Sequence, residues 1–166
     1  MLVAFGFSMA WVNWIMNLIS STFFSVLVNG VPSGIITPTR GIRQGDPLSP
    51  FLLILIAEGL GWSISASKEA NSIRGLRGTP DGASHSHQQF VDDTMLMGYP
   101  FVQEASSFRK CLDQFGSASG LEFNAQKSKV FFFNTPSITH RNIFRILGFS
   151  KGFLPATFLG TPLINT

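Results

Sequence analysis

Charge is scarce in this sequence. Only 13% of its 166 residues are Asp, Glu, Lys or Arg, about half the share found in an average soluble domain. Because so little charge is combined with 45% apolar residues, global intrinsic disorder is excluded. The length fits one domain, and the net charge of +3 suits a polyanionic partner without requiring one.

Cysteine is nearly absent. Cys111 is the one cysteine, so an internal disulfide framework and a cysteine-rich zinc site are both excluded. Its place on the apolar face of an expected helix predicts a core position. The lack of disulfides favours a reducing compartment, so we expect an intracellular protein, nuclear or cytoplasmic, that is not secreted.

The first 39 residues lack charge altogether, and Arg40 is the first charged residue. This stretch leaves a small membrane-associated protein open as an alternative. Polar residues interrupt the stretch, however, and it has no basic lead-in of the kind that a secretory signal needs. The opening segment, MLVAFGF, has no polar lead-in either, so we expect the chain to start inside a core.

The same stretch has the pattern of a helix followed by a hairpin. Ser8 is expected to cap a helix whose shared face carries Trp11, Ile15, Leu18 and Ile19. Residues 22–28 favour a strand, and Asn29-Gly30 is a hairpin turn signal. Further on, Ser49 is expected as the N-cap of a buried helix over 51–66, with Pro50 as its first residue.

The remaining pattern predicts an α+β fold. An amphipathic helix is expected over 101–115 and a basic-faced helix over 138–147. Strands are expected on both sides of Asp92-Asp93, over 130–133 and near 158–159. Residues 109–151 contain seven basic and two acidic side chains, so this region is expected to face a phosphate backbone.

Two adjacent acids, Asp92 and Asp93, form the sharpest local signal. They are expected at the tip of a hairpin, where like charges repel and need a compensating cation or full solvation. Mg²⁺ binds one or two carboxylates together with substrate phosphates, and paired ions can assist phosphoryl transfer. An ordinary solvated turn remains the alternative, because Asp is a common turn residue.

The loop over residues 40–50 is dense in special residues. Gly41 and Gly45 permit close backbone approach to a ligand, and Arg40 and Arg43 can meet phosphate. Gln44 can both donate and accept hydrogen bonds. A structural loop, in which Asp46 caps the following helix, explains the same residues equally well.

The histidines and tryptophans carry weaker signals. His85 and His87 flank Ser86 at a spacing that can hold a metal. Because no cysteine or third histidine is near, a structural role is favoured. Trp11, Trp14 and Trp62 are expected to be packing residues.

Taken together, four segments resemble reverse transcriptase, with the closest likeness to the non-LTR retrotransposon type of plant genomes. They are RGIRQGDPLSP at 40–50, FVDD at 90–93, GLEFN at 120–124 with Lys127-Ser128, and FLGTPL at 158–163. The resemblance extends over nearly the whole chain, and the segments follow the family's order and spacing.

The resemblance implies a polymerase palm, in which helices back a small antiparallel sheet. The implied reaction adds deoxynucleotides, from their triphosphates, to a DNA primer 3′ end on an RNA template, with Mg²⁺ or Mn²⁺ as cofactor. Asp92 and Asp93 match the catalytic metal ligands, and Lys127 matches a basic residue near the leaving pyrophosphate. Arg40, Arg43, Gln44 and Gly45 match the nucleotide and template pocket, and Leu159-Gly160 match the turn that grips the primer.

The sequence also departs from the family pattern. The family's first catalytic Asp lies on a strand before the opening helix, whereas nothing upstream of Arg40 is acidic here. Val91 stands where Ala is commoner. We therefore expect residues 1–166 to be a single truncated palm domain, without fingers or thumb, that is inactive alone. A nucleic-acid-binding remnant without catalysis is the competing interpretation, and the sequence leaves the oligomeric state open.

Overall fold

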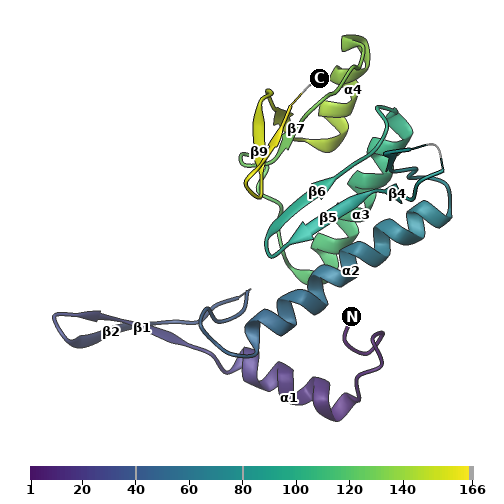
Figure 1. Cartoon of the computed structure of the whole chain (residues 1–166). Coiled ribbons are helices and arrows are strands. Elements are labelled where there is room, and N and C mark those ends of the chain that lie inside the picture. The colour runs from purple at the N-terminus through teal and green to yellow at the C-terminus, as the bar shows by residue number, and fades with distance from the viewer. Residues whose placement is uncertain (40, 80, 165–166) are drawn as a thin grey trace.

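The computed structural model describes residues 1–39, 41–79 and 81–164. Within these residues it contains four helices joined by short strands (Figure 1), which confirms the expected α+β class. The helices are α1 (Met9–Ser20), α2 (Ser49–Glu69), α3 (Val102–Ser119) and α4 (Ser137–Leu147). The strands are β1 (Phe24–Val28), β2 (Val31–Ile36), β3 (Leu76–Arg77), β4 (Ser84–His85), β5 (His87–Phe90), β6 (Asp93–Leu96), β7 (Lys129–Val130), β8 (Ser150–Lys151), β9 (Ala156–Phe158) and β10 (Thr161–Leu163).

The strands pair two by two. Among the described residues they form β1–β2, β3–β4, β5–β6 and β9–β10, which are antiparallel, and β7–β8, which is parallel. One small antiparallel sheet was expected, whereas the described strands form five separate two-stranded sheets, one of them parallel. The strands of the parallel sheet lie on either side of α4 in the sequence, and the crossover through a helix is the connection that a parallel pair needs.

Helix α1 begins where the sequence predicts. The Ser8 hydroxyl accepts a hydrogen bond from the Trp11 N–H at 3.3 Å, which satisfies one of the free donors of the first turn. Ile15 is buried, but Leu18, expected on the same face, is 61% exposed. The expectation for Leu18 was wrong because α1 is covered along a narrow stripe only.

Helix α2 is longer and less covered than the sequence suggested. It begins at Ser49, with Leu48 at the N-cap position, so Ser49 is not the cap. The Ser49 hydroxyl instead donates to the Arg43 carbonyl at 2.6 Å. Phe51 and Ile54 are 66% and 65% exposed, so the expectation of a buried helix holds only along one face, which carries Leu52, Leu60 and Ile64. By length and composition α2 is the one helix of the described chain that is apolar enough to cross a membrane, and 22% of its apolar window is buried.

The core lies between α2 and α3. Its buried members are Leu60, Ile64, Ile73, Phe108, Cys111, Leu112 and Phe115. The predicted core position of Cys111 is therefore confirmed, since its side chain is 2% exposed. Helix α3 continues through Gly116 and ends at Gly120, whose left-handed backbone, φ 73°, forms the C-cap, because a residue without a Cβ adopts this conformation at little cost.

The tryptophans are less buried than expected. Trp11 stacks on Phe7 with ring centroids 4.2 Å apart, and Trp62 lies against Phe5 with centroids 4.8 Å apart. Trp62 is nevertheless 54% exposed and Trp14 is 68% exposed. The expectation that the tryptophans are packing residues is confirmed for Trp11 and partly for Trp62. It was wrong for Trp14, because the outer face of α1 is uncovered.

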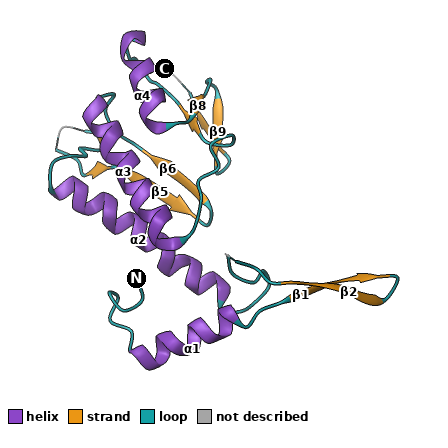
Figure 2. Cartoon of the chain, turned by 180° about the vertical axis from the view of Figure 1, so that it is seen from behind, coloured by secondary structure: helices purple, strands orange, loops and turns teal. Residues whose placement is uncertain are grey.

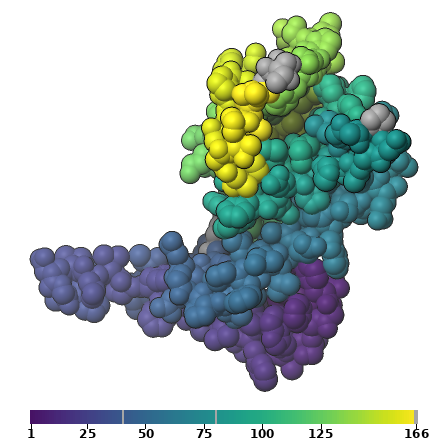
Figure 3. All heavy atoms as spheres, viewed as in Figure 1, coloured from purple at the N-terminus to yellow at the C-terminus, as the bar shows by residue number. Residues whose placement is uncertain are grey.

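The β1–β2 hairpin, residues 24–36, projects from the body of the molecule and is called the arm below. Its turn is Asn29-Gly30, as predicted, and both residues have positive φ, 51° and 82°. Every residue of β1 and β2 is exposed. The space-filling view shows the arm extending away from the helices (Figure 3).

Candidate active site

The β5–β6 hairpin carries Asp93 on its outer face and Asp92 in its turn. Phe90 pairs with Asp93, and Gln89 with Thr94, and residues directly opposite in an antiparallel pair lie on the same face. Phe90 and Asp93 are exposed, whereas Leu96 on the other face packs against the core. Asp93 is therefore directed away from the core.

Close packing against a glycine holds this hairpin on α2. A Cβ built on Gly61 would lie 3.2 Å from His87 Nε2 and 3.6 Å from Gln89 Oε1. The inner side chains of β5 thus lie directly on the α2 backbone. In Figures 1 and 2 the hairpin runs alongside α2, with its turn toward the N-terminal half of that helix.

His87 belongs to this packing layer rather than to a metal site. Burial lowers the pKa of its imidazole below the ordinary value of 6.5, while Glu58 raises that pKa and Lys68 lowers it. The Ser86 hydroxyl lies 3.2 Å from His87 Nδ1. A histidine that packs on a helix, with a pKa lowered by burial, has the structural role that the sequence favoured.

The turn that presents Asp92 is strained. It consists of Val91 and Asp92, between Phe90 and Asp93, and Val91 has φ 53°. A β-branched residue rarely adopts this left-handed conformation, and strained backbone concentrates at functional sites. Val91, Asp92 and Asp93 are all exposed, so the carboxylates are accessible to a cation and to solutes.

The glycine-rich loop is fastened to the start of α2. Asp46 Oδ1 accepts a hydrogen bond from the Leu48 N–H at 2.8 Å. Leu48 is itself the N-cap residue, and no side chain caps the first turn of α2, so the capping role considered for Asp46 was wrong and Asp46 instead closes the turn before the helix. Between the bond to Asp46 and the bond from Ser49 to the Arg43 carbonyl, the exposed residues Arg43, Gln44 and Gly45 form an ordered bend. Arg40, the remaining predicted residue of this loop, lies outside the described residues.

Lys127 follows a tight turn after α3. Asn124 Oδ1 accepts hydrogen bonds from the backbone N–H groups of Gln126 and Lys127, at 3.0 and 3.1 Å, so the turn is built by an asparagine that bonds to its own chain. The Lys127 side chain is exposed.

Leu159 and Gly160 form the two-residue turn of the β9–β10 hairpin. Their φ angles are 50° and 79°, and Phe158 pairs with Thr161 across the turn. The predicted turn is therefore present, and Leu159 is 42% exposed at its tip.

These predicted residues lie on separate elements. Within the part of the chain that the structure describes, no hydrogen bond or ion pair joins the side chains of Asp92, Asp93, Arg43, Gln44 or Lys127 to one another. All of these side chains are exposed. Asp92, Arg43, Gln44 and Lys127 lie in turns or loops, and Asp93 is the first residue of β6. The arrangement can contact a large solute but does not enclose a small one.

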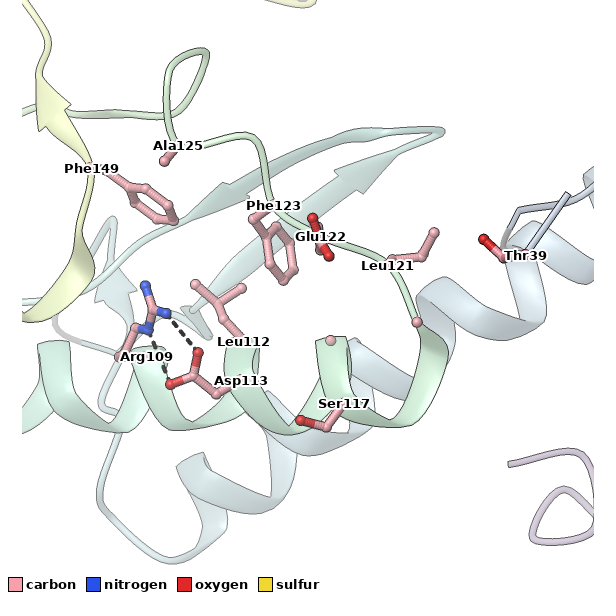
Figure 4. A pocket seen from close by; sticks show the side chains of 12 residues that line it. Thr39, Arg109, Leu112, Asp113, Ser117, Leu121, Glu122, Phe123, Ala125 and Phe149 are labelled. Atoms are coloured by element: carbon pink, nitrogen blue, oxygen red, sulfur yellow. Dashed lines mark hydrogen bonds and ion pairs between the residues drawn. The ribbon is translucent and has the colours of Figure 1, made fainter.

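A hollow of about 670 Å³ lies elsewhere, between α3 and residues 120–125 (Figure 4). The paired side chains of Arg109 and Asp113, joined at 2.8 Å, lie on its α3 side, and Phe123 and Phe149 form part of its wall. None of the predicted catalytic residues lines it.

The sequence interpretation missed Glu104. This acid is only 3% exposed, and its Oε1 accepts hydrogen bonds from the N–H groups of Arg74 and Gly75 at 3.1 and 3.2 Å. It also lies against the position of Gly98, where a Cβ would come within 2.6 Å of Glu104 Oε1. The signal was available, since Glu104 precedes Phe108 by four residues on the apolar face of α3.

The chemistry of the acidic pair fits one or two hard cations bound together with phosphate. Two adjacent exposed carboxylates offer oxygen ligands of the type that Mg²⁺ and Mn²⁺ take. The described residues contain no group of three or more His, Cys, Asp or Glu side chains placed to hold a metal by themselves.

Comparison with known proteins identifies a family whose reaction is nucleotide polymerisation. The family described as reverse transcriptase (RNA-dependent DNA polymerase) matches residues 2–161. An uncharacterized mitochondrial protein of Arabidopsis thaliana is 43% identical over 68 residues, which are 41% of this chain and 56% of that protein. The match thus spans little more than half of that curated relative. Since the family match includes the glycine-rich loop, the acidic hairpin and the turn at Leu159, the chain belongs to the reverse transcriptase family.

Proposed function

We propose that this chain is the palm part of an RNA-directed DNA polymerase of the non-LTR retrotransposon type. Asp92 and Asp93 would hold Mg²⁺ or Mn²⁺ together with the phosphates of an incoming deoxynucleoside triphosphate, with an RNA template and a DNA primer as partners. The single observation that carries this proposal is the exposed carboxylate pair on a strained two-residue turn.

Each residue has a role in this proposal. The metal, when bound, would stabilise negative charge on the reacting phosphate and activate the primer hydroxyl. Asp92 extends from the tip of the turn and serves as the main ligand, while Asp93 is held in the ladder beside it. Arg43 and Gln44 meet the nucleotide and template, Lys127 neutralises charge that develops toward pyrophosphate, and Leu159-Gly160 contact the primer.

Turnover by the isolated 166-residue chain is not expected. Two-metal catalysis needs carboxylates that bridge both ions, and the sequence before Arg40 contains no acid to add to the pair. The loss of such a ligand costs several kcal/mol of transition-state stabilisation. The proposal is therefore of a polymerase domain whose own residues bind metal and nucleotide, without processive synthesis by this polypeptide alone.

Metal binding is tested directly by titrating Mn²⁺ and following water proton relaxation, with and without a deoxynucleoside triphosphate. Asp92→Asn is expected to abolish the binding that depends on nucleotide, and Asp93→Asn to weaken it. Asp81→Asn, which changes an exposed loop carboxylate, is the matched control and should bind as the wild type does. Equal binding by all three variants would contradict the proposed ligands.

Primer extension on an RNA template with Mg²⁺ tests the rest of the proposal. The wild-type chain should give little or no product. Processive synthesis by the purified chain would refute the inactivity, while leaving the assignment of Asp92 and Asp93 to be judged by their variants.

A non-catalytic nucleic-acid-binding role is the second candidate, favoured by one observation. Five basic side chains of the C-terminal third are exposed: Lys127, Lys129, Arg141, Arg145 and Lys151. Binding through such groups releases counterions, so affinity should fall steeply as salt rises. Absence of binding to single-stranded RNA at low salt would eliminate this role.

A further inference from the structure

The C-terminal part of the chain carries charge of one sign. After Glu122 the sequence contains no Asp or Glu, but it contains five basic side chains: Lys127, Lys129, Arg141, Arg145 and Lys151. All five are exposed, and in the part of the chain that the structure describes none of them forms an ion pair. Residues 123–164 are called the basic end below, because α4 and strands β7, β8 and β9 lie together at one end of the molecule (Figures 1 and 2).

One of these cations is paired with an aromatic ring. Lys151 Nζ lies over the ring of Phe153, 5.2 Å from its centroid, within the range of a cation–π contact. Phe153 is nevertheless 73% exposed, so the ammonium leaves most of the ring accessible. The pair therefore offers a flat apolar surface and a positive charge side by side in solvent.

The backbone beneath this pair is held in place by β7. Val130 lies opposite Lys151 in the parallel β7–β8 pair, and its carbonyl accepts a hydrogen bond from the Gly152 N–H at 2.8 Å. A Cβ on Gly152 would overlap the ring of Phe131, so that ring packs directly on the backbone between Lys151 and Phe153. The exposed ring is thus presented by an ordered segment, which lowers the entropy lost on binding.

Further cations lie on the same elements. Lys129 Nζ donates to Ser150 Oγ at 2.8 Å, which holds a second ammonium beside β8. On α4, Arg141 and Arg145 are four residues apart and therefore share a helix face. A strand of phosphates that reaches the basic end meets several positive charges and no acid of residues 123–164, so its binding releases counterions.

The exposed ring narrows the form of the polyanion. Since the chain belongs to the reverse transcriptase family, nucleic acid is the relevant polyanion. Bases inside a duplex stack on one another, whereas the bases of a single strand can be splayed out and stacked on aromatic side chains. A basic surface with an aromatic stacking platform is typical of proteins that bind single strands without sequence preference.

We propose that the basic end binds a single-stranded nucleic acid, with one base stacked on Phe153 and the neighbouring phosphates on Lys151 and Lys129. The inference rests on the nucleic-acid-binding role given above and deepens it, since it names the contact site and the form of the strand. The contact uses neither the carboxylates of Asp92 and Asp93 nor a bound metal. RNA and DNA strands should both bind, because every base has a face that can stack.

Fluorescence anisotropy with a labelled oligouridylate tests the proposal on the full 166-residue chain. EDTA in the buffer removes divalent ions and so keeps the acidic pair out of the measurement. Phe153→Leu should weaken binding about 5–100-fold, as expected for the loss of one base–aromatic stack, with an unchanged slope of log affinity against log salt. Lys151→Gln should reduce that slope by about 0.7, because one phosphate contact with a single strand is lost. Phe153→Trp should restore the affinity.

The chain contains a matched control for the ring. Phe101 is 50% exposed, and Arg74 Cζ lies 5.3 Å from its centroid, so this residue forms the same kind of pair outside the basic end. Phe101→Leu should therefore bind oligouridylate as the wild type does. An abasic strand of equal length should bind the wild type and Phe153→Leu equally, since it offers phosphates without bases. Far-UV circular dichroism should be the same for all variants.

The outcomes separate this inference from the broader role. Equal affinity of the wild type and Phe153→Leu for oligouridylate, with normal salt dependence, would overturn the stacking contact but leave nucleic-acid binding intact. Tighter binding of double-stranded RNA than of oligouridylate would refute the single-stranded form. Absence of binding at low salt, or binding to phosphatidylserine vesicles only, would overturn both the inference and the nucleic-acid-binding role.

Discussion

Replacement of Val91 by Asn should stabilise the protein, although the residue lies at the candidate active site. Val91 has φ 53° and is 63% exposed. The left-handed conformation costs an L-residue about 1–2 kcal/mol, and a β-branched side chain suffers most. Because Val91 is mostly exposed, little apolar burial is lost when it is replaced.

The expected gain is about 1 kcal/mol, since Asn tolerates the left-handed conformation better than a β-branched residue does. For a chain of this size, such a gain raises Tm by about 2–4 °C. Urea unfolding followed by tryptophan fluorescence, together with calorimetry, measures both quantities. Glycine in place of Asn should gain less, because it adds freedom to the unfolded chain.

The matched control is Val31→Asn. Val31 is 65% exposed and lies in a strand, outside the residues with positive φ. There the substitution only weakens strand propensity, so stability should fall slightly or stay the same. If Val91→Asn proves no more stable than the wild type, the strained turn is refuted, and with it the structural argument for a site at Asp92.

Three further predictions concern the core and the layer beneath the hairpin. Glu104→Ala should lower the free energy of unfolding in urea by about 2 kcal/mol, because it leaves the buried N–H groups of Arg74 and Gly75 without their acceptor. An unchanged urea midpoint of unfolding would show that these N–H groups do not depend on Glu104. Ile64→Ala, at a side chain with 0% exposure, should cost about 2–5 kcal/mol, and a loss below that of a typical surface substitution would show that the α2–α3 core is misplaced. Since burial lowers the pKa of His87 below 6.5, its contribution is complete above that pH and is lost as the pH falls toward its folded pKa, because the unfolded state then binds more protons. His87→Gln should flatten this part of the curve of stability against pH, and an unaltered acid slope would mean that another group causes it.

Local signals predicted most of the elements. The Ser8 cap, the Asn29-Gly30 turn and the acidic hairpin all depend on short-range chemistry, and all three are present. The helix expected over 101–115 is present as Val102–Ser119, with Gly120 as its C-cap. Such features are decided by a few neighbouring residues, so the sequence contains the information.

Which apolar side chains are covered by another element could not be predicted in the same way. An apolar residue predicts burial only if some other element lies over it, and this depends on distant parts of the chain. Leu18, Trp14 and Phe51 were expected to be packed, but each is more than half exposed. The place of Glu104 on the apolar face of α3 signals its burial, but its partners, the N–H groups of Arg74 and Gly75, lie about 30 residues away in the sequence and no local pattern reveals them.

The sequence by itself determined the family, the α+β class and the identity of the acidic pair, because order, spacing and turn chemistry are written in one dimension. Only the tertiary structure decided that Asp93 lies on the outer face of a hairpin packed on Gly61, and that Val91 is strained where Asp92 is presented. It also left the arm uncovered. The physical reason is that faces, edges and strain depend on which distant segments come into contact.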